Sequence, residues 1–421
     1  MKTLYLHIGM PKTGTTSIQK FCINNKKHLE EQGYIYPESI HRYGHVSLRR
    51  NGHFLVGVCD EEGERNFDRE DELREYGFEM LAKAFETYDN VILSDENIWH
   101  GSIKRKPEIW GLLLEHSKKY NYQIRVIVYL RRQDDLALSW INQQVKAGWS
   151  SFRECTWEYF LENPHMIRLN YKKHIDEIAA ILGKDSIRVR VFEFGQFKGV
   201  ADNIYSDFLD AIDLELNDTY VIEEDRTNAS LNCNGQEIKR ILNGLFDAND
   251  LDTVRYIRNT VNESMGTLNK SDSYEYLSVD ERKEFLSRFE EGNQFIAREY
   301  LGKEDGKLFK DVTSKKEKWT PTNPEMHEDM IRFFGTVMIK QYKEIQKLKE
   351  EKKQLQVTNK KLQATAKELQ ATTKDLQAEL KTEISKLQNE QLKLKKDLKS
   401  LNSKVDSSIT QKIKRRLPKM K

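Results

Sequence analysis

The sequence predicts an α/β protein in which a P-loop-like parallel β-sheet is flanked by helices and followed by a long C-terminal coiled-coil helix. Three observations support this prediction: short apolar runs alternate with helical stretches, a glycine-containing loop follows the first run, and leucines recur every seven residues near the C-terminus. Alternating strands and helices are typical of a parallel sheet that helices cover on both faces.

The predicted strands are short runs rich in β-branched and aromatic residues: Leu4 to Ile8, Val91 to Leu93, Ile124 to Leu130 and Ile187 to Phe192. The first run leads into the loop, and residues 17–31 are expected to continue as one helix. Residues 200–335 show helical spacing of apolar side chains. The prolines of "WTPTNPEM" mark the expected end of this domain, which gives a first domain over 1–320 and a linker or helix over 321–340.

The C-terminal part carries Leu348, Leu355, Leu362, Leu369 and Leu376 at the d positions of a heptad repeat. Its a positions are largely polar, and Asn359 among them favours a dimer in one register. A four-residue step from Leu376 to Leu380 is a stutter. We therefore expect a coiled coil over 341–406 that joins two copies or a partner, with a single solvated helix as the alternative. A basic tail over 407–421 either contacts an anionic membrane surface weakly or keeps the end soluble.

Bulk properties set further limits on the class of protein. The net charge of +2 hides an acidic body and a basic C-terminal part. The four cysteines are widely spaced and form no CxxC pair, so neither a zinc site nor a disulfide framework is indicated. The N-terminus lacks the apolar run of a signal peptide, and we expect a cytoplasmic protein without a metal or a nucleic-acid partner.

The loop "HIGMPKTGTTSIQ" at 7–19 has the spacing of a phosphate-binding loop, with Gly9 and Gly14 separated by four residues. Backbone N–H groups in such a loop converge on an anion, and the helix that follows adds a partial positive charge. An NTPase would carry lysine at position 15, where this chain has Thr15. A lysine stands inside the loop instead, at Lys12. Hydroxyl donors surround it at Thr13, Thr15, Thr16 and Ser17.

Two further groups of polar residues follow predicted strands. Arg131 ends the third strand, and Ser139 lies about two turns into the next helix, so the pair is placed to clamp a second phosphate. A surface salt bridge of Arg131 with Asp134 or Asp135 is the alternative. Asp95 and Glu96 end the second strand, where a carboxylate could abstract a proton, bind magnesium or simply cap a helix.

The segments "PKTGTTSIQ" and "YLRRQDDLALS" resemble the sulfotransferases that use 3′-phosphoadenosine 5′-phosphosulfate (PAPS), and the similarity to bacterial members acting on glycans extends over about two-thirds of the chain. The resemblance implies that Lys12, Thr13, Gly14, Thr15, Thr16 and Ser17 bind the 5′-phosphosulfate. It also implies that Arg131 and Ser139 bind the 3′-phosphate, and that Lys12 faces the bridging oxygen. No metal is implied.

The resemblance further implies a glutamate or histidine as the catalytic base. Glu96 fits this role best, and His45 and His53 compete with it. By family analogy the acceptor is a hydroxyl, or an amine, of a saccharide, polysaccharide or glycolipid. Two alternatives remain. One is a P-loop kinase or NTPase with a displaced lysine and with Asp95 and Glu96 on magnesium; the other is an inactive scaffold whose coiled coil is the working part.

Overall fold

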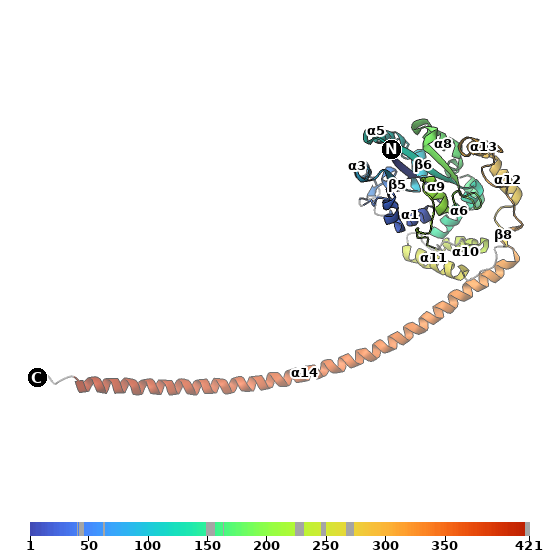
Figure 1. Ribbon diagram of the computed structural model, residues 1–421. Helices are drawn as coiled ribbons and strands as arrows, with labels where there is room; N and C mark the ends of the chain where they lie inside the picture. Colours follow the sequence, from blue (N-terminus) through green and yellow to red (C-terminus); the bar gives the residue numbers. More distant parts are fainter. Residues whose placement is uncertain are drawn as a thin grey trace. The chain divides into compact units, whose positions relative to one another are not determined.

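The computed structural model describes residues 1–39, 41, 46–61, 64–148, 156–162, 164–223, 231–245, 250–266 and 273–416. The chain divides into two compact units, Met1–Thr336 and Val337–Lys421. The predicted α/β class is confirmed for the first unit, since a parallel sheet flanked by helices forms its centre (Figure 1).

Within the described residues the central sheet has five strands in the order β2-β5-β1-β6-β7, all parallel. β1 (Lys2–His7) pairs with β5 (Asn90–Ser94) on one side and with β6 (Tyr122–Leu130) on the other. β7 (Ile187–Val191) and β2 (Tyr34–Ile35) form the edges. The two-residue β2 was missed by the sequence prediction, because a strand this short has no periodicity to detect and is defined by its pairing with β5.

The helices of the first unit are α1 (Thr15–Asn24), α2 (Lys26–Glu31), α3 (Phe67–Thr87), α4 (Asn97–Lys104), α5 (Ile109–Tyr120), α6 (Gln133–Ala147), α7 (Trp157–Leu161), α8 (Tyr171–Leu182), α9 (Ile204–Ala211), α10 (Cys233–Asn243), α11 (Leu251–Gly266), α12 (Val279–Ser287) and α13 (Glu290–Leu301). Short 3-10 helices are η1 (His53–Leu55), η3 (Pro164–Leu169) and η4 (Lys184–Ser186), and two small ladders join β3 (Asp60–Glu61) to β4 (Glu64–Arg65) and β8 (Tyr274–Glu275) to β9 (Glu317–Lys318).

Two hydrophobic cores lie on the two faces of the sheet. Successive side chains of β1 point to opposite faces of the sheet, so Leu4 and Leu6 lie in the larger core and Tyr5 lies in the smaller one. The larger core contains buried residues of α3, α5, α6, α8 and α13, and the smaller one those of α1, α2 and α9. Both faces of the sheet are therefore covered, which explains why its strands read as continuous apolar runs.

The single helix expected over residues 17–31 is wrong, because the chain breaks at Asn25 between α1 and α2. The side-chain amide of Asn25 donates to the carbonyl of Val221 at 2.9 Å and accepts from the N–H of Val221 at 2.7 Å. A contact between residues so distant in sequence favours the bend, and local spacing does not reveal it.

The strand order places a topological switch point between β1 and β6. From β1 the chain continues through β2 and β5 on one side of the sheet, and it then crosses to β6 and β7 on the other. Ligands of open parallel sheets bind beyond the carboxyl ends of the strands at such a point. The loop after β1 and the residues after β6 therefore meet where a ligand is expected.

The helix α14 (Pro324–Arg416) begins with a proline, whose fixed φ suits the first turn of a helix, and it supplies the second unit (orange to red in Figure 1). The d-position leucines from Leu348 to Leu376 are 56 to 69% exposed in the single chain. A long C-terminal helix is therefore present, and its association with a partner stays a prediction.

Candidate functional site

The loop between β1 and α1 turns by means of left-handed backbone conformations. Gly9 has φ 86°, Lys12 has φ 70° and Gly14, which caps α1, has φ 76°. Lysine adopts this region at a cost, so the conformation of Lys12 is held by its surroundings. The first N–H groups of α1 lack intrahelical acceptors, and they point toward the loop with the positive end of the helix dipole. The loop therefore has the backbone features of an anion site.

Both glycines of the loop are also required by close approach. A Cβ on Gly9 would lie 2.8 Å from the Cα of Glu96, and one on Gly14 would lie 2.2 Å from Cδ1 of Ile204. The loop thus packs against the end of β5 and against α9. Larger residues at these positions would displace the loop from the sheet.

The hydroxyl groups of the loop have two different roles. Thr13 is fully buried, and its hydroxyl donates to the carbonyl of Met10 within the loop. Thr15, Thr16 and Ser17 instead line a cavity of about 830 Å³, together with Lys12 and Gly14. The structure therefore brings all the predicted loop residues except Thr13 to the cavity, and it gives Thr13 a contact that holds the loop in shape.

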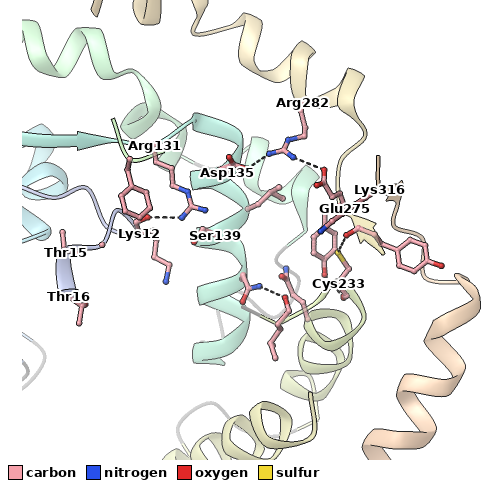
Figure 2. A pocket seen from close by; sticks show the side chains of 18 of the residues that line it. Lys12, Thr15, Thr16, Arg131, Asp135, Ser139, Cys233, Glu275, Arg282 and Lys316 are labelled. Carbon is pink, nitrogen blue, oxygen red and sulfur yellow. Dashed lines mark hydrogen bonds and ion pairs between the residues drawn. The ribbon is translucent and has the colours of Figure 1, made fainter. Parts of the chain in front are cut away.

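Arg131, directly after β6, and Ser139, on α6, line the same cavity. Nη1 of Arg131 donates to the carbonyl of Lys12 at 3.0 Å, and the hydroxyl of Tyr171 donates to the carbonyl of Arg131 at 2.7 Å. Figure 2 shows the side chains of Lys12, Arg131 and Ser139 directed toward a common space. The two segments that the sequence separates by more than a hundred residues are thus adjacent.

The predicted alternative for Arg131, an ion pair with Asp134 or Asp135, does not occur among the described residues. Asp134 and Asp135 instead accept from Arg132, at 2.9 Å each, and from Arg282. Arg282 belongs to α12 and also pairs with Glu275 of β8 at 2.9 Å. Arg132 and Arg282 therefore form the ion pairs with these two carboxylates, and the side chain of Arg131 lines the cavity instead.

Three cations in or near this cavity have pKa values that burial lowers. Burial lowers the pKa of Lys12, and the charge of Arg131 lowers it further. Burial likewise lowers the pKa of Arg131. Lys146 of α6, which the sequence analysis did not single out, has a pKa lowered by burial and then by the charge of Lys12. Cations that disfavour one another are stabilised by an anion placed between them.

The remaining wall of the cavity comes from residues that sequence reasoning missed. They lie on α10, on β8 and after it, on α12 and near β9: Cys233, Gln236, Tyr274, Glu275, Tyr276, Arg282 and Lys316 (Figure 2). Phe192, after β7, also lines the cavity, so this part of the wall is aromatic and polar. No motif marks these residues, because only the packing of helices distant in sequence brings them to the site.

Asp95 and Glu96 follow β5 as predicted, but they do not line the cavity. Asp95 is fully buried, and its two carboxylate oxygens accept from Arg50 at 2.8 and 2.9 Å. The side chain of Glu96 is 24% exposed, accepts from the side chain of Gln19 at 3.1 Å and lies 3.7 Å from Arg50. Of the two carboxylates, Glu96 is therefore the accessible one.

Of the two histidines expected as competing bases, His53 lies within the described residues and His45 does not. His53 is buried in η1, where its ring nitrogens lie 2.6 Å from the carbonyl of Arg50 and 3.3 Å from that of His41. His53 is therefore enclosed, and like Glu96 it does not line the cavity, but unlike Glu96 it is not accessible. His45 lies outside the described residues.

No protein-family model matches this chain, and no curated protein matches its sequence. Within the described residues, no helix combines the length and apolarity needed to cross a membrane. In the same part of the chain, no three His, Cys, Asp or Glu side chains gather as a metal site requires. The geometry of the cavity therefore carries the functional argument.

Proposed function

We propose that the protein is a sulfotransferase that moves the sulfuryl group of PAPS to a hydroxyl or amine of a saccharide, polysaccharide or glycolipid. The observation that carries this proposal is the convergence of Lys12, Arg131 and Ser139 on one cavity at the switch point of the sheet. Two anion-binding groups of residues at one cavity suit a nucleotide with phosphates at both its 5′ and 3′ positions.

The assignment of groups to the donor follows from the lining of the cavity. The loop N–H groups with Thr15, Thr16 and Ser17 would bind the 5′-phosphosulfate, and Arg131 with Ser139 would bind the 3′-phosphate. The wall that contains Phe192, Gln236 and Tyr276 would take the nucleoside, because aromatic and amide side chains suit a planar base. A volume of about 830 Å³ accommodates such a ligand.

The proposed reaction is an in-line transfer. The acceptor oxygen or nitrogen forms a bond to sulfur as the bond from sulfur to the bridging phosphate oxygen breaks, and adenosine 3′,5′-bisphosphate leaves with the electron pair. Lys12 stabilises the charge that develops on the leaving oxygen. Glu96 takes the acceptor proton, a role that its partial exposure permits. Positioning and preorganised charge supply most of the rate enhancement.

Two observations favour this proposal over a kinase or NTPase. Position 15 is threonine, so the lysine that would reach the terminal phosphates is absent from its usual place. Both oxygens of Asp95 are paired with Arg50, which leaves this carboxylate poorly placed for magnesium. An inactive scaffold would have no need for this cavity. Its partly buried cations cost free energy because burial removes them from water, and a scaffold offers no reason to keep them.

We also propose that α14 forms a parallel coiled-coil dimer. The exposed leucines of the d positions share one face at seven-residue spacing, and Asn359 at an a position favours two strands in register. The coiled coil would then set the number of catalytic units rather than take part in the chemistry.

The test is calorimetric titration with adenosine 3′,5′-bisphosphate and, separately, with ATP and magnesium. We expect the bisphosphate to bind and Arg131→Ala to weaken it by roughly thirtyfold, equivalent to about 2 kcal/mol. Arg125→Ala is the matched control, because Arg125 lies on β6, the strand that leads to Arg131, does not line the cavity and donates to the carbonyl of Asp185 at 2.8 Å. Binding of magnesium ATP alone would favour the kinase, and binding of neither nucleotide would favour the scaffold.

A further inference from the structure

Asn234, in the first turn of α10, is bound by the segment that leads into α14 and by α14 itself. Its side chain is buried, and both of its polar atoms form hydrogen bonds. The oxygen accepts from the indole N–H of Trp319 and from the side-chain amide of Asn323, at 2.8 Å each. The nitrogen donates to the carboxylate of Asp329, on α14, at 2.9 Å. Because a buried amide cannot exchange these partners for water, the three bonds favour one position of α10.

The same turn of α10 forms part of the wall of the donor cavity. Cys233 and Gln236, which flank Asn234 along the helix, both line this cavity. The hydroxyl of Tyr276, another lining residue, donates to the carbonyl of Cys233 at 2.9 Å. Asn234 therefore connects α14 to residues that surround the proposed nucleotide.

The part of the wall that β8 forms is connected to α14 as well. β8 pairs with β9, and the N–H of Trp319, directly after β9, donates to the carbonyl of Glu275 at 2.7 Å. The rings of Tyr276 and Trp319 have centroids 5.3 Å apart. The hydroxyl of Ser273, directly before β8, donates to Glu325 in the first turn of α14 at 3.0 Å. Two separate pieces of the cavity wall thus depend on the same junction.

The first turns of α14 belong to the first compact unit, which extends to Thr336. Met326 and Phe333 of these turns are buried. The boundary expected after residue 320 would therefore separate the wall of the cavity from the residues that stabilise it.

We propose that the first turns of α14 are part of the donor site, and that Asn234 and Asp329 are positioning residues that fix α10 beside the bound donor. This inference rests on the proposed sulfotransferase function. Neither side chain lines the cavity, so both act on the donor through Cys233 and Gln236. A wall that is already in place does not have to be ordered when the ligand binds, and binding is tighter for that reason.

The test exchanges the two partners of this hydrogen bond in the full-length protein. Asn234→Asp brings two carboxylates together in a buried place, so we expect calorimetry above neutral pH to show roughly tenfold weaker binding of adenosine 3′,5′-bisphosphate. Asp329→Asn alone retains an acceptor for Asn234 and should have little effect. Asn234→Asp combined with Asp329→Asn restores a donor facing an acceptor at the net charge of the wild type, and should recover most of the affinity.

Ser102→Ala is the control for stability alone. Ser102 is buried, donates to the carbonyl of Ile98 at 2.7 Å and does not line the donor cavity. This variant should unfold more easily and bind the bisphosphate as the wild type does. If Asn234→Asp does not fold, Asp329→Ala replaces it, because Asp329 is half-buried and its loss removes the acceptor of the Asn234 amide. Unchanged affinity in the variant used would overturn the inference, and so would a loss of affinity in Asn234→Asp that the combined variant fails to recover.

Hydrogen exchange distinguishes a failure of this inference from a failure of the proposed function. In Asn234→Asp we expect amide exchange in 233–243 and 274–276 to be roughly tenfold faster than in the wild type, and the combined variant should restore the slower rates. If the wild type binds no bisphosphate, the sulfotransferase proposal fails, and these rates alone decide whether α14 stabilises the wall. Exchange that is the same in all variants would show that it does not.

Discussion

Arg131 donates a hydrogen bond of 3.0 Å from Nη1 to the backbone carbonyl of Lys12, which joins the end of β6 to the loop after β1. One side chain therefore both supplies charge to the cavity and holds the residue that faces the leaving group in our proposal. Substitution of Arg131 is expected to reduce ligand binding through both effects, whereas substitution of Ser139 removes only a contact.

Gly9→Ala should destabilise the protein strongly, because the new Cβ would meet the backbone of Glu96 at 2.8 Å and because φ is 86°. We expect a loss of roughly 3 kcal/mol in the free energy of unfolding, measured by urea denaturation. Gly33→Ala is the control for backbone conformation alone: φ is 83° and no atom lies within 4 Å of the added carbon. It should cost about 1 kcal/mol. Equal losses in the two variants would show that the approach of Gly9 to Glu96 is not a constraint.

Thr13→Val and Ser139→Ala should separate stability from binding. Thr13→Val leaves the buried carbonyl of Met10 without its donor, so we expect unfolding to become about 1 to 2 kcal/mol more favourable. Ser139→Ala should weaken bisphosphate binding about tenfold, since it removes one hydrogen bond to a charged group, and should change stability by less than about 0.5 kcal/mol. Denaturation and calorimetry on both variants check this. A Ser139→Ala protein with unchanged affinity would remove Ser139 from the donor site.

The pKa of Lys12 predicts opposite pH dependences for binding and folding. In the free protein this pKa is lowered from 10.5 by burial and then by Arg131, so Lys12 loses its proton at lower pH than in the unfolded chain. Between the two values the unfolded state binds more protons, and the contribution of Lys12 to stability therefore rises with pH. Bisphosphate binding needs the charged form and should weaken as pH rises through the same window.

Calorimetry in buffers of different ionisation enthalpy should accordingly detect proton uptake on binding at alkaline pH. Lys12→Arg should abolish this uptake, because arginine keeps its charge throughout the range. Uptake that persists in Lys12→Arg would assign the proton to another group, such as Lys146.

The proposed dimer predicts that Leu355→Asn combined with Leu362→Asn converts the protein to a monomer, because two apolar pairs of the seam become polar. Sedimentation equilibrium of the full chain measures the change. Gln354→Asn combined with Lys361→Asn makes the same number of changes outside the a and d positions and should leave the dimer intact. A monomeric wild-type protein would show that α14 is a single solvated helix.

Much of the fold was predictable because local signals and final structure agree. Four of the sheet strands occur where apolar runs predicted them, and the loop lies between a strand and a helix as its glycines required. The exceptions depend on distant contacts. Asn25 interrupts a helix through its bonds to Val221, and β2 exists only through its pairing with β5.

The candidate site divides in the same way. The sequence by itself determined the loop with Gly9, Lys12 and Gly14, and the positions of Arg131 and Ser139 after a strand, since spacing along the chain carries that information. Only the tertiary structure decided that Thr13 faces inward and that Arg282 takes the carboxylates near Arg131. The physical reason is that burial and charge pairing are set by contacts between segments far apart in the sequence, which no local pattern encodes.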